Sequence, residues 1–263
     1  MYNPFQLITK YLHYYLKASN SKGHGVHSPF VFDFITKVLN DDTKYPCYLT
    51  VENKRNEFLG DKRVIEVEDY GAGSTKLKET RRKISAIAQT SVKKKKWGQL
   101  LFRIAQYYSI NSVLELGTSL GITTSYLAHG AKRVFSIEGA PQVAKVASES
   151  FHQQKLENIS LYTGSFETQL PVVFHELANV DMVFIDGHHL KIPTLAYFSQ
   201  ISRFVHNDSI IIFDDIHWSK EMEQAWEEVK SYDGVKLSID LFFIGLVFFN
   251  SNFKEKQHFS IRF

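Results

Sequence analysis

The chain lacks the features that would place it in several special classes of protein. Its 263 residues include a single cysteine, Cys47, which excludes an internal disulfide framework and favours a reducing compartment such as the cytoplasm. It has no run of about 18 apolar residues, so we expect no membrane span, and its N-terminus has no basic-then-apolar secretory pattern. The formal net charge of +3 is too small to indicate a nucleic-acid partner by itself.

From residue 112 onward, short apolar segments alternate with helix-like segments. We predict strands at 113–116, 133–137, 159–162, 181–185 and 209–213, with helices at 122–129, 141–154, 193–204 and 220–230. Two further strands, 235–239 and 243–249, are joined too closely for a parallel crossover, so we expect them to be antiparallel. The sequence therefore predicts the α/β class, with a Rossmann-like doubly wound sheet that is mostly parallel and ends in an antiparallel hairpin.

The first ninety residues have a different pattern. Apolar residues at helical spacing predict a first helix: Phe5, Ile8, Leu12 and Tyr15. This helix could lie on a membrane surface, although it has no strongly basic face. Further helices are predicted at 28–39, 75–88 and 97–108. We expect a helical N-terminal extension, residues 1–92, packed over the mouth of the sheet that residues 93–263 form.

A glycine-containing turn follows the strand at 113–116. The strand ends in Glu115, and the turn carries Gly117, Thr118, Ser119 and Gly121 before a helix begins. A dinucleotide-binding turn would have glycine where this chain has Ser119, and an acid at the strand end would repel a pyrophosphate. A cationic nucleoside without phosphate, such as S-adenosylmethionine, suits this turn better. A second glycine-containing loop, at 70–74, follows a segment of alternating charge, and we interpret it as a flexible turn.

The turn resembles the first motif of the class I S-adenosylmethionine-dependent methyltransferases, and the resemblance covers roughly residues 97–249. It implies that the turn residues and Glu115 bind the cofactor. Glu138 ends the second strand about 20 residues after Gly117, as expected for a carboxylate that accepts both ribose hydroxyls. The loop after the third strand borders the adenine in this family; here it holds Gly164, Ser165 and Phe166. The alternative for these positions is an ordinary surface Glu and a generic turn.

Two neighbouring predicted strands end in acids. Asp186 follows one, and the pair Asp214 and Asp215 follows the other. Three carboxylates at one sheet edge repel each other unless a cation lies between them, and oxygen ligands favour Mg²⁺. The pattern is similar to the metal-dependent O-methyltransferases typified by catechol O-methyltransferase, where an Asp and an Asp-Asn pair occupy these places. The resemblance therefore implies that these three acids bind a metal, with Asp215 in the place of Asn.

In the same family, a Lys three residues after the first Asp acts as the general base. His189 stands at this position. Since an ordinary His, with a pKa near 6.5, is mostly neutral at pH 7, we expect His189 or its neighbour His188 to take a proton, with Asp186 completing the catalytic set. The alternative is that both histidines only orient the loop.

The leading function is therefore O-methylation of a small molecule with S-adenosylmethionine, assisted by a divalent metal such as Mg²⁺. One alternative is a methyltransferase acting on RNA or protein, docked through the lysine run 93–96, although no recognised RNA-binding motif accompanies this run. Another is a non-catalytic protein that binds S-adenosylmethionine and pairs with a partner. The methyl acceptor and the oligomeric state stay open, with a homodimer as one option.

Overall fold

The computed structural model describes residues 1–23, 25–67 and 80–263, so the glycine-containing loop at 70–74 lies outside the described residues. The chain forms two compact units. Unit 1 is Met1–Asp41 together with Asn179–Phe263, and unit 2 is Asp42–Ala178. The predicted division of the chain at residue 92 stays a prediction.

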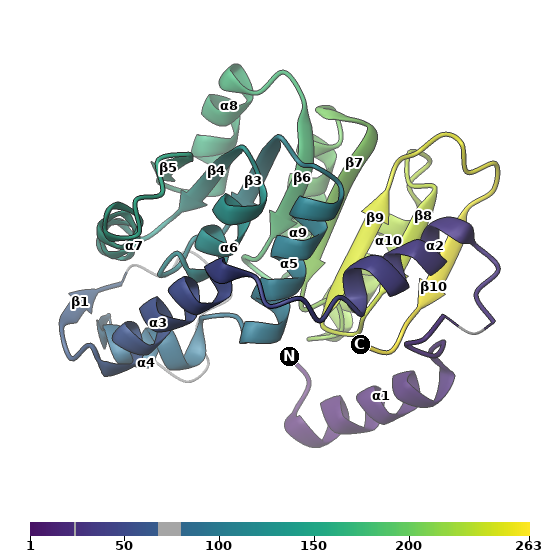
Figure 1. Cartoon of the computed structure of the whole chain (residues 1–263), viewed down its shortest axis with the longest axis horizontal. Helices are drawn as coiled ribbons and strands as arrows, with labels where there is room; N and C mark the ends of the chain where they lie inside the picture. The colour runs from purple at the N-terminus through teal and green to yellow at the C-terminus, as the bar shows by residue number, and fades with distance from the viewer. Residues whose placement is uncertain (24, 68–79) are drawn as a thin grey trace. The chain divides into compact units, whose positions relative to one another are not determined.

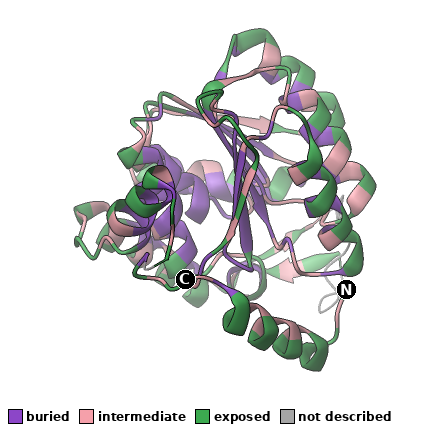
Figure 2. Ribbon diagram, turned by 90° about the vertical axis from the view of Figure 1, so that its right-hand side faces the viewer, coloured by how far each residue is buried: buried purple, intermediate pink, exposed green. Residues whose placement is uncertain are grey.

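Unit 2 is built on three parallel strands: β3 (Ser112–Leu116), β4 (Arg133–Glu138) and β5 (Ile159–Thr163). β4 lies between the other two and pairs in parallel with both. The strands alternate with helices α5 (Lys95–Tyr107), α6 (Ile122–Gly130), α7 (Pro141–Gln153) and α8 (Phe166–Glu176), as Figure 1 shows. Apolar runs bury β3 and β4 almost completely. Figure 2 shows in purple that the buried residues of the chain gather in its strands and in the helix faces beside them. Helix α8 was not predicted, because Pro171 inside it suggests a helix break.

The rest of unit 2 contains helices α3 (Pro46–Gly60) and α4 (Ile84–Thr90) and an antiparallel pair, β1 (Val64–Glu66) with β2 (Arg81–Lys83). Val51 of α3 and Ile84 of α4 pack in one apolar cluster with Tyr126 of α6. The predicted helix at 75–88 is wrong at its start, because residues 81–83 pair with β1 and the helix begins only at Ile84. Residues 75–79 lie outside the described chain.

Unit 1 contains β6 (Val180–Ile185), β7 (Val205–Asp214), β8 (Leu237–Asp240), β9 (Ile244–Phe248) and β10 (Gln257–Ser260). β6 and β7 are parallel, β9 is antiparallel to both β7 and β8, and β10 runs parallel to β8. Its helices are α1 (Pro4–Lys17), α2 (Pro29–Asp33), which continues into a π-helical turn at Phe34–Leu39, α9 (Lys191–Ile201) and α10 (Lys220–Ser231).

The predicted α/β class is confirmed. In unit 2 the pairs β3–β4 and β4–β5 are parallel, and in unit 1 the pairs β6–β7 and β8–β10 are parallel. The last two predicted strands form the expected antiparallel pair, β8 with β9. None of the helices within the described residues is both long enough and apolar enough to cross a membrane.

Helix α1 is attached to unit 1 through aromatic rings. Asn3 and Gln6 form a capping box at its start, with Pro4 at the first helical position. The Tyr11 and Tyr14 rings lie 5.0 and 5.3 Å from the ring of Phe242, between their centroids. The Tyr14 hydroxyl also donates to the backbone carbonyl of Ile261. These contacts hold one side of α1 against the turn between β8 and β9.

A partly buried charge network reinforces this attachment. Glu223 of α10 accepts hydrogen bonds from the Tyr2 hydroxyl at 2.7 Å and the Lys10 ammonium at 3.0 Å. The His217 ring bridges two carboxylates, with Nδ1 3.0 Å from Glu223 and Nε2 2.8 Å from Asp240. Burial of His217 lowers its pKa, but the hydrogen bonds and charges of Asp240 and Glu223 outweigh burial, so the pKa is raised above its ordinary value.

A His217→Gln variant should therefore lose stability in a pH-dependent way. Because the folded-state pKa is raised, the contribution of His217 is fully present below about pH 6.5 and is lost as pH rises through the raised value. We expect a destabilisation of about 2 kcal/mol near pH 6 that narrows at alkaline pH, measured by urea unfolding. The control His13→Gln, on the exposed side of α1, should change stability by less than about 0.5 kcal/mol throughout. A constant difference across this range would contradict the prediction.

Candidate functional site

The turn between β3 and α6 has a backbone that few residues adopt. Gly117, Ser119 and Gly121 have positive φ values of 103°, 49° and 78°. The backbone N–H groups of Gly117 and Thr118 donate to the Ile137 carbonyl of β4, at 3.0 and 3.3 Å. Gly121 also lies close to α7, since a Cβ there would stand 2.5 Å from the Phe151 ring. The turn is therefore fixed at the end of the parallel strands.

The Glu138 carboxylate connects this turn to the end of β4. Oε2 accepts from the Ser119 N–H at 2.7 Å, and Oε1 accepts from the Ala140 N–H at 2.9 Å. The Glu138 carbonyl accepts from the Gly164 N–H at 2.9 Å, which joins the loop after β5 to the same place. Burial raises the pKa of Glu138, while the backbone N–H donors oppose this shift. The three segments predicted to hold a cofactor thus lie together.

Glu115 lies inside unit 2 and is fully buried. Its Oε2 accepts from the hydroxyls of Thr124 and Ser136, both at 2.6 Å, and the hydroxyl oxygens of Ser136 and Thr118 are 2.5 Å apart. These bonds tie α6, β4 and the turn to one carboxylate. Sequence reasoning did not find Thr124 or Ser136, although a Ser inside the apolar strand 133–137 was a usable signal. Cofactor binding by Glu115 stays a prediction.

The loop after β5 caps helix α8. Ser165 is the N-cap residue, and its hydroxyl accepts from the Thr168 N–H at 3.4 Å. Gly164 has a φ of 144°, and Phe166 is buried at the start of the helix. Ser165 and Phe166 therefore each have a structural role at the start of α8. Their predicted contacts with adenine stay predictions.

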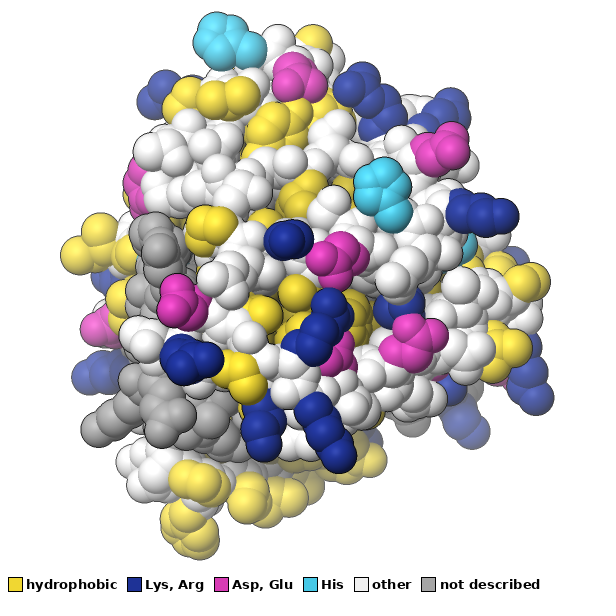
Figure 3. Space-filling view, turned by 90° about the vertical axis from the view of Figure 1, so that its left-hand side faces the viewer, with side chains coloured by type: hydrophobic (Ala, Val, Ile, Leu, Met, Phe, Trp, Pro, Cys, Tyr) yellow, Lys and Arg dark blue, Asp and Glu magenta, His cyan; other side chains and the backbone are white. Residues whose placement is uncertain are grey.

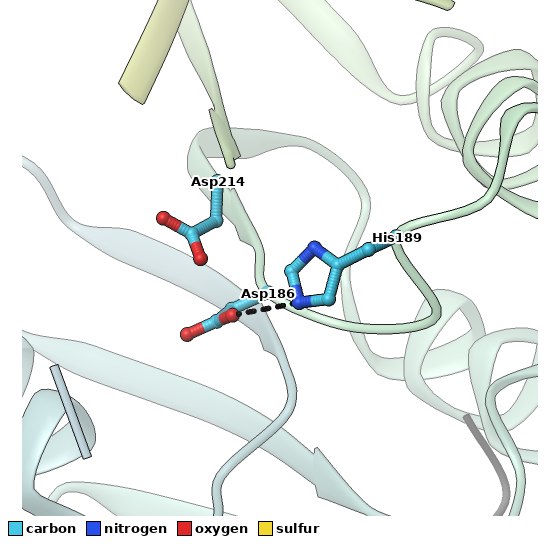
Figure 4. Close-up of side chains that lie close together, drawn as sticks. All are labelled: Asp186, His189 and Asp214. Atoms are coloured by element: carbon cyan, nitrogen blue, oxygen red, sulfur yellow. Dashed lines mark ion pairs between the residues drawn. The ribbon is translucent and has the colours of Figure 1, made fainter. Parts of the chain in front are cut away.

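In unit 1, two acids and a histidine form a second cluster. Asp186 follows β6, Asp214 ends β7 and is buried, and His189 belongs to the loop after Asp186, as Figure 4 shows. His189 Nε2 is 3.5 Å from Asp186 Oδ1. One ligand atom from each of the three residues lies within 4.8 Å of the others, and no other such group of three occurs among the residues the structure describes.

Asp215 is not among the three residues of this cluster, and its predicted part in metal binding stays a prediction. It stands one residue after β7 with a φ of 51°, and its N–H donates to the Phe243 carbonyl at 2.7 Å. His189 takes the third place instead.

The two histidines of this loop have separate partners. Both have positive φ values, 61° at His188 and 42° at His189, which is uncommon for residues other than glycine. His188 Nδ1 lies 3.2 Å from the hydroxyl of Tyr197, a buried residue of α9. Thus His189 faces Asp186 while His188 is positioned by Tyr197.

The donor set fits a divalent cation. An ion of the size of Mg²⁺ binds oxygen at about 2.1 Å, so two of its ligands lie at most about 4.2 Å apart. The three donor atoms lie within 4.8 Å of one another, and the distance of 3.5 Å between His189 Nε2 and Asp186 Oδ1 is already below the limit of about 4.2 Å. Two carboxylates suit Mg²⁺ or Mn²⁺, and the imidazole adds a nitrogen ligand that favours transition metals.

The lysine run lies at the start of α5. Lys94 is the N-cap residue and Lys95 begins the helix, where cations oppose the helix dipole. The Lys96 ammonium lies 5.3 Å from the centre of the Trp97 ring. On the face shown in Figure 3, basic and acidic side chains are interspersed, so that face carries no extended patch of one sign.

Comparisons with known proteins agree with this geometry. Residues 114–216 match a family model described as a methyltransferase domain. The O-methyltransferase TomG of Streptomyces achromogenes, solved with S-adenosylmethionine, has a similar structure, with 16% identity, a TM-score of 0.57 and coverage of 80% of this chain and 92% of TomG. An O-methyltransferase of Bacillus cereus, solved with S-adenosylhomocysteine, is 18% identical with a TM-score of 0.54, and the match covers 80% of this chain and 93% of that one. The Podospora anserina methyltransferase PaMTH1 is 10% identical with a TM-score of 0.59, and the match covers 85% of this chain and 97% of that one. No curated protein sequence matches the chain.

A Gly121→Ala variant should destabilise the turn. The added methyl group meets the Phe151 ring and the φ of 78° disfavours any side chain, so we expect a loss of about 1 to 3 kcal/mol in urea unfolding. Gly60→Ala is the matched control, because a Cβ at Gly60 meets nothing within 4 Å. Equal stability of the two variants would contradict the close approach of the turn and α7.

Proposed function

We propose that this chain transfers a methyl group from S-adenosylmethionine to a hydroxyl oxygen of a small-molecule acceptor. The proposal is supported by the match of residues 114–216 to a methyltransferase domain and by the likeness of the fold to O-methyltransferases solved with S-adenosylmethionine or S-adenosylhomocysteine. The predicted resemblance to class I methyltransferases is confirmed by the family model and by the shared fold. An oxygen acceptor is supported by the similar structures that are named O-methyltransferases and by the acid–histidine cluster of unit 1.

The observation that carries the proposal is the hydrogen bond of 2.7 Å between the Ser119 N–H and Glu138 Oε2. It joins two motifs that the resemblance assigns to one cofactor. S-adenosylmethionine supplies an activated methyl group when bound. In the proposal, Glu138 accepts the ribose hydroxyls, the turn from Gly117 to Gly121 supports the rest of the nucleoside, and Gly164, Ser165 and Phe166 border the adenine.

The acid–histidine cluster is proposed to prepare the acceptor. A divalent cation bound by Asp186, Asp214 and His189 would lower the pKa of an acceptor hydroxyl. A histidine of the same loop takes the proton from this hydroxyl. His189 does so if it is not a ligand, and His188, held by the Tyr197 hydroxyl, does so if His189 is one.

Replacing Glu138 tests the proposed binding of the cofactor. Titration calorimetry should detect S-adenosylhomocysteine binding to the wild type and no binding of NAD. Glu138→Ala should weaken binding by roughly 1 to 3 kcal/mol, because hydrogen bonds to a charged group are lost. The matched control Glu149→Ala removes an exposed acid of α7 and should leave the affinity unchanged. If Glu138→Ala bound S-adenosylhomocysteine like the wild type, the assignment of this carboxylate would be wrong.

Measuring cation binding tests the proposed role of the acid–histidine cluster in preparing the acceptor hydroxyl. Mn²⁺ titration should show one site, and Asp186→Ala and Asp214→Ala should each weaken it by roughly tenfold or more. Asp208→Asn, an exposed acid of β7, should bind like the wild type. EDTA should abolish methyl transfer to a hydroxyl acceptor. Full activity of Asp186→Ala together with no effect of EDTA would remove the cation from the proposal.

A His189→Lys variant separates the two roles of His189. If His189 is the base, Mn²⁺ binding is kept and activity shifts to higher pH, because a lysine loses its proton only at higher pH. If His189 is a ligand, Mn²⁺ binding weakens and His188→Gln is the variant that loses turnover.

A further inference from the structure

Helix α1 exposes a continuous apolar stripe. Five large apolar side chains repeat every three or four residues along it and are all exposed: Phe5, Ile8, Leu12, Tyr15 and Leu16. Phe5 and Leu16 are each 78% exposed and Leu12 is 56% exposed. No residue of α1 is buried, and Figure 2 accordingly shows the helix in green and pink. Such a stripe on one helix is unusual unless it contacts something else.

The stripe is held in place by a neighbouring side of the same helix. Leu7, Tyr11 and Tyr14 are partly buried and form a second stripe, of which Tyr11 and Tyr14 pack on Phe242. The end of α1 is fixed as well, because Ser19 pairs with Ile261 beside β10. The helix cannot turn its exposed stripe inward without breaking these contacts.

The segment that contains the stripe carries charge of one sign. Residues 1–32 contain three lysines and no Asp or Glu, although 28 of the 263 residues are acidic. Lys17 is exposed on the last turn of α1, and the Arg262 guanidinium lies 4.6 Å from the centre of the Tyr15 ring. The nearby carboxylates Glu223 and Asp240 are already engaged by Lys10 and His217. The rim of the stripe is therefore cationic.

This charge favours one kind of occupant. In a two-fold contact with a second copy, the same stripe would face itself, and residues 1–32 of that copy would offer no carboxylate to Lys17 or Arg262. An anionic lipid surface offers both an apolar layer for Phe5, Leu12 and Leu16 and negative headgroups for the rim. We propose that the exposed stripe of α1 docks this protein on anionic membranes, with the helix lying in the lipid interface between the bilayer and unit 1.

Vesicle flotation of the full chain tests this proposal. The wild type should float with vesicles of phosphatidylcholine and phosphatidylglycerol, and only weakly with phosphatidylcholine alone. The triple variant Phe5→Gln, Leu12→Gln, Leu16→Gln should reduce binding by roughly tenfold or more. A matched triple variant replaces exposed apolar residues elsewhere and should bind like the wild type: Leu49→Gln, Leu59→Gln and Val172→Gln.

A charge variant guards against misfolding of the triple variant. Lys17→Gln keeps the apolar stripe and should weaken binding to the anionic vesicles by about fivefold, the effect of about 1 kcal/mol per cation. The proposal is overturned if the wild type does not bind anionic vesicles, or if neither variant changes binding. It is also overturned if sedimentation equilibrium shows a wild-type dimer that the α1 triple variant converts to a monomer, because the stripe would then join two copies.

Discussion

The structure of unit 2 around the candidate cofactor site depends on one partly desolvated carboxylate. Burial raises the pKa of Glu138, and the two backbone N–H groups of Ser119 and Ala140 offset this cost. A carboxylate offers about four lone-pair positions, and the backbone donors around Glu138 do not use all of them. Glu138 therefore fixes the turn and keeps the capacity to accept a hydroxyl donor, as the proposed ribose contact requires.

The two acids of the cofactor motif have different tasks because they differ in burial. Glu115 is fully buried, and hydroxyls of Thr124 and Ser136 satisfy one of its oxygens from two different elements. Glu138 lies at the strand end, where backbone groups hold it. An internal acid that ties α6 to β4 keeps the turn in place, and the acid at the edge can then meet a ligand. Both tasks require a carboxylate, so the motif alone does not distinguish them.

Sequence patterns predicted the strands that consist of continuous buried apolar residues. They missed a strand that is held mainly by backbone hydrogen bonds to its neighbour. The apolar runs of β3, β4 and β6 revealed these strands. Strand β10 was missed because Gln257–Ser260 has no apolar run and is held by backbone pairing with β8. Among site residues, Asp186 and Asp214 were predicted to converge and do so. That His189 joins Asp186 and Asp214 in the cluster depends on the backbone angles of the loops after β6 and β7. The spacing of residues along the chain does not encode these angles.

Those backbone angles carry a cost that bears on the chemistry of the loop. Left-handed φ values at His188 and His189 each cost of the order of 1 kcal/mol or more and persist only where surrounding contacts impose them. Here the contacts are different for the two rings: a carboxylate for His189 and a buried phenol for His188. The loop thus separates two neighbouring imidazoles instead of leaving them interchangeable. This separation places the two rings in different surroundings, so the reaction proposed above can use them for different roles.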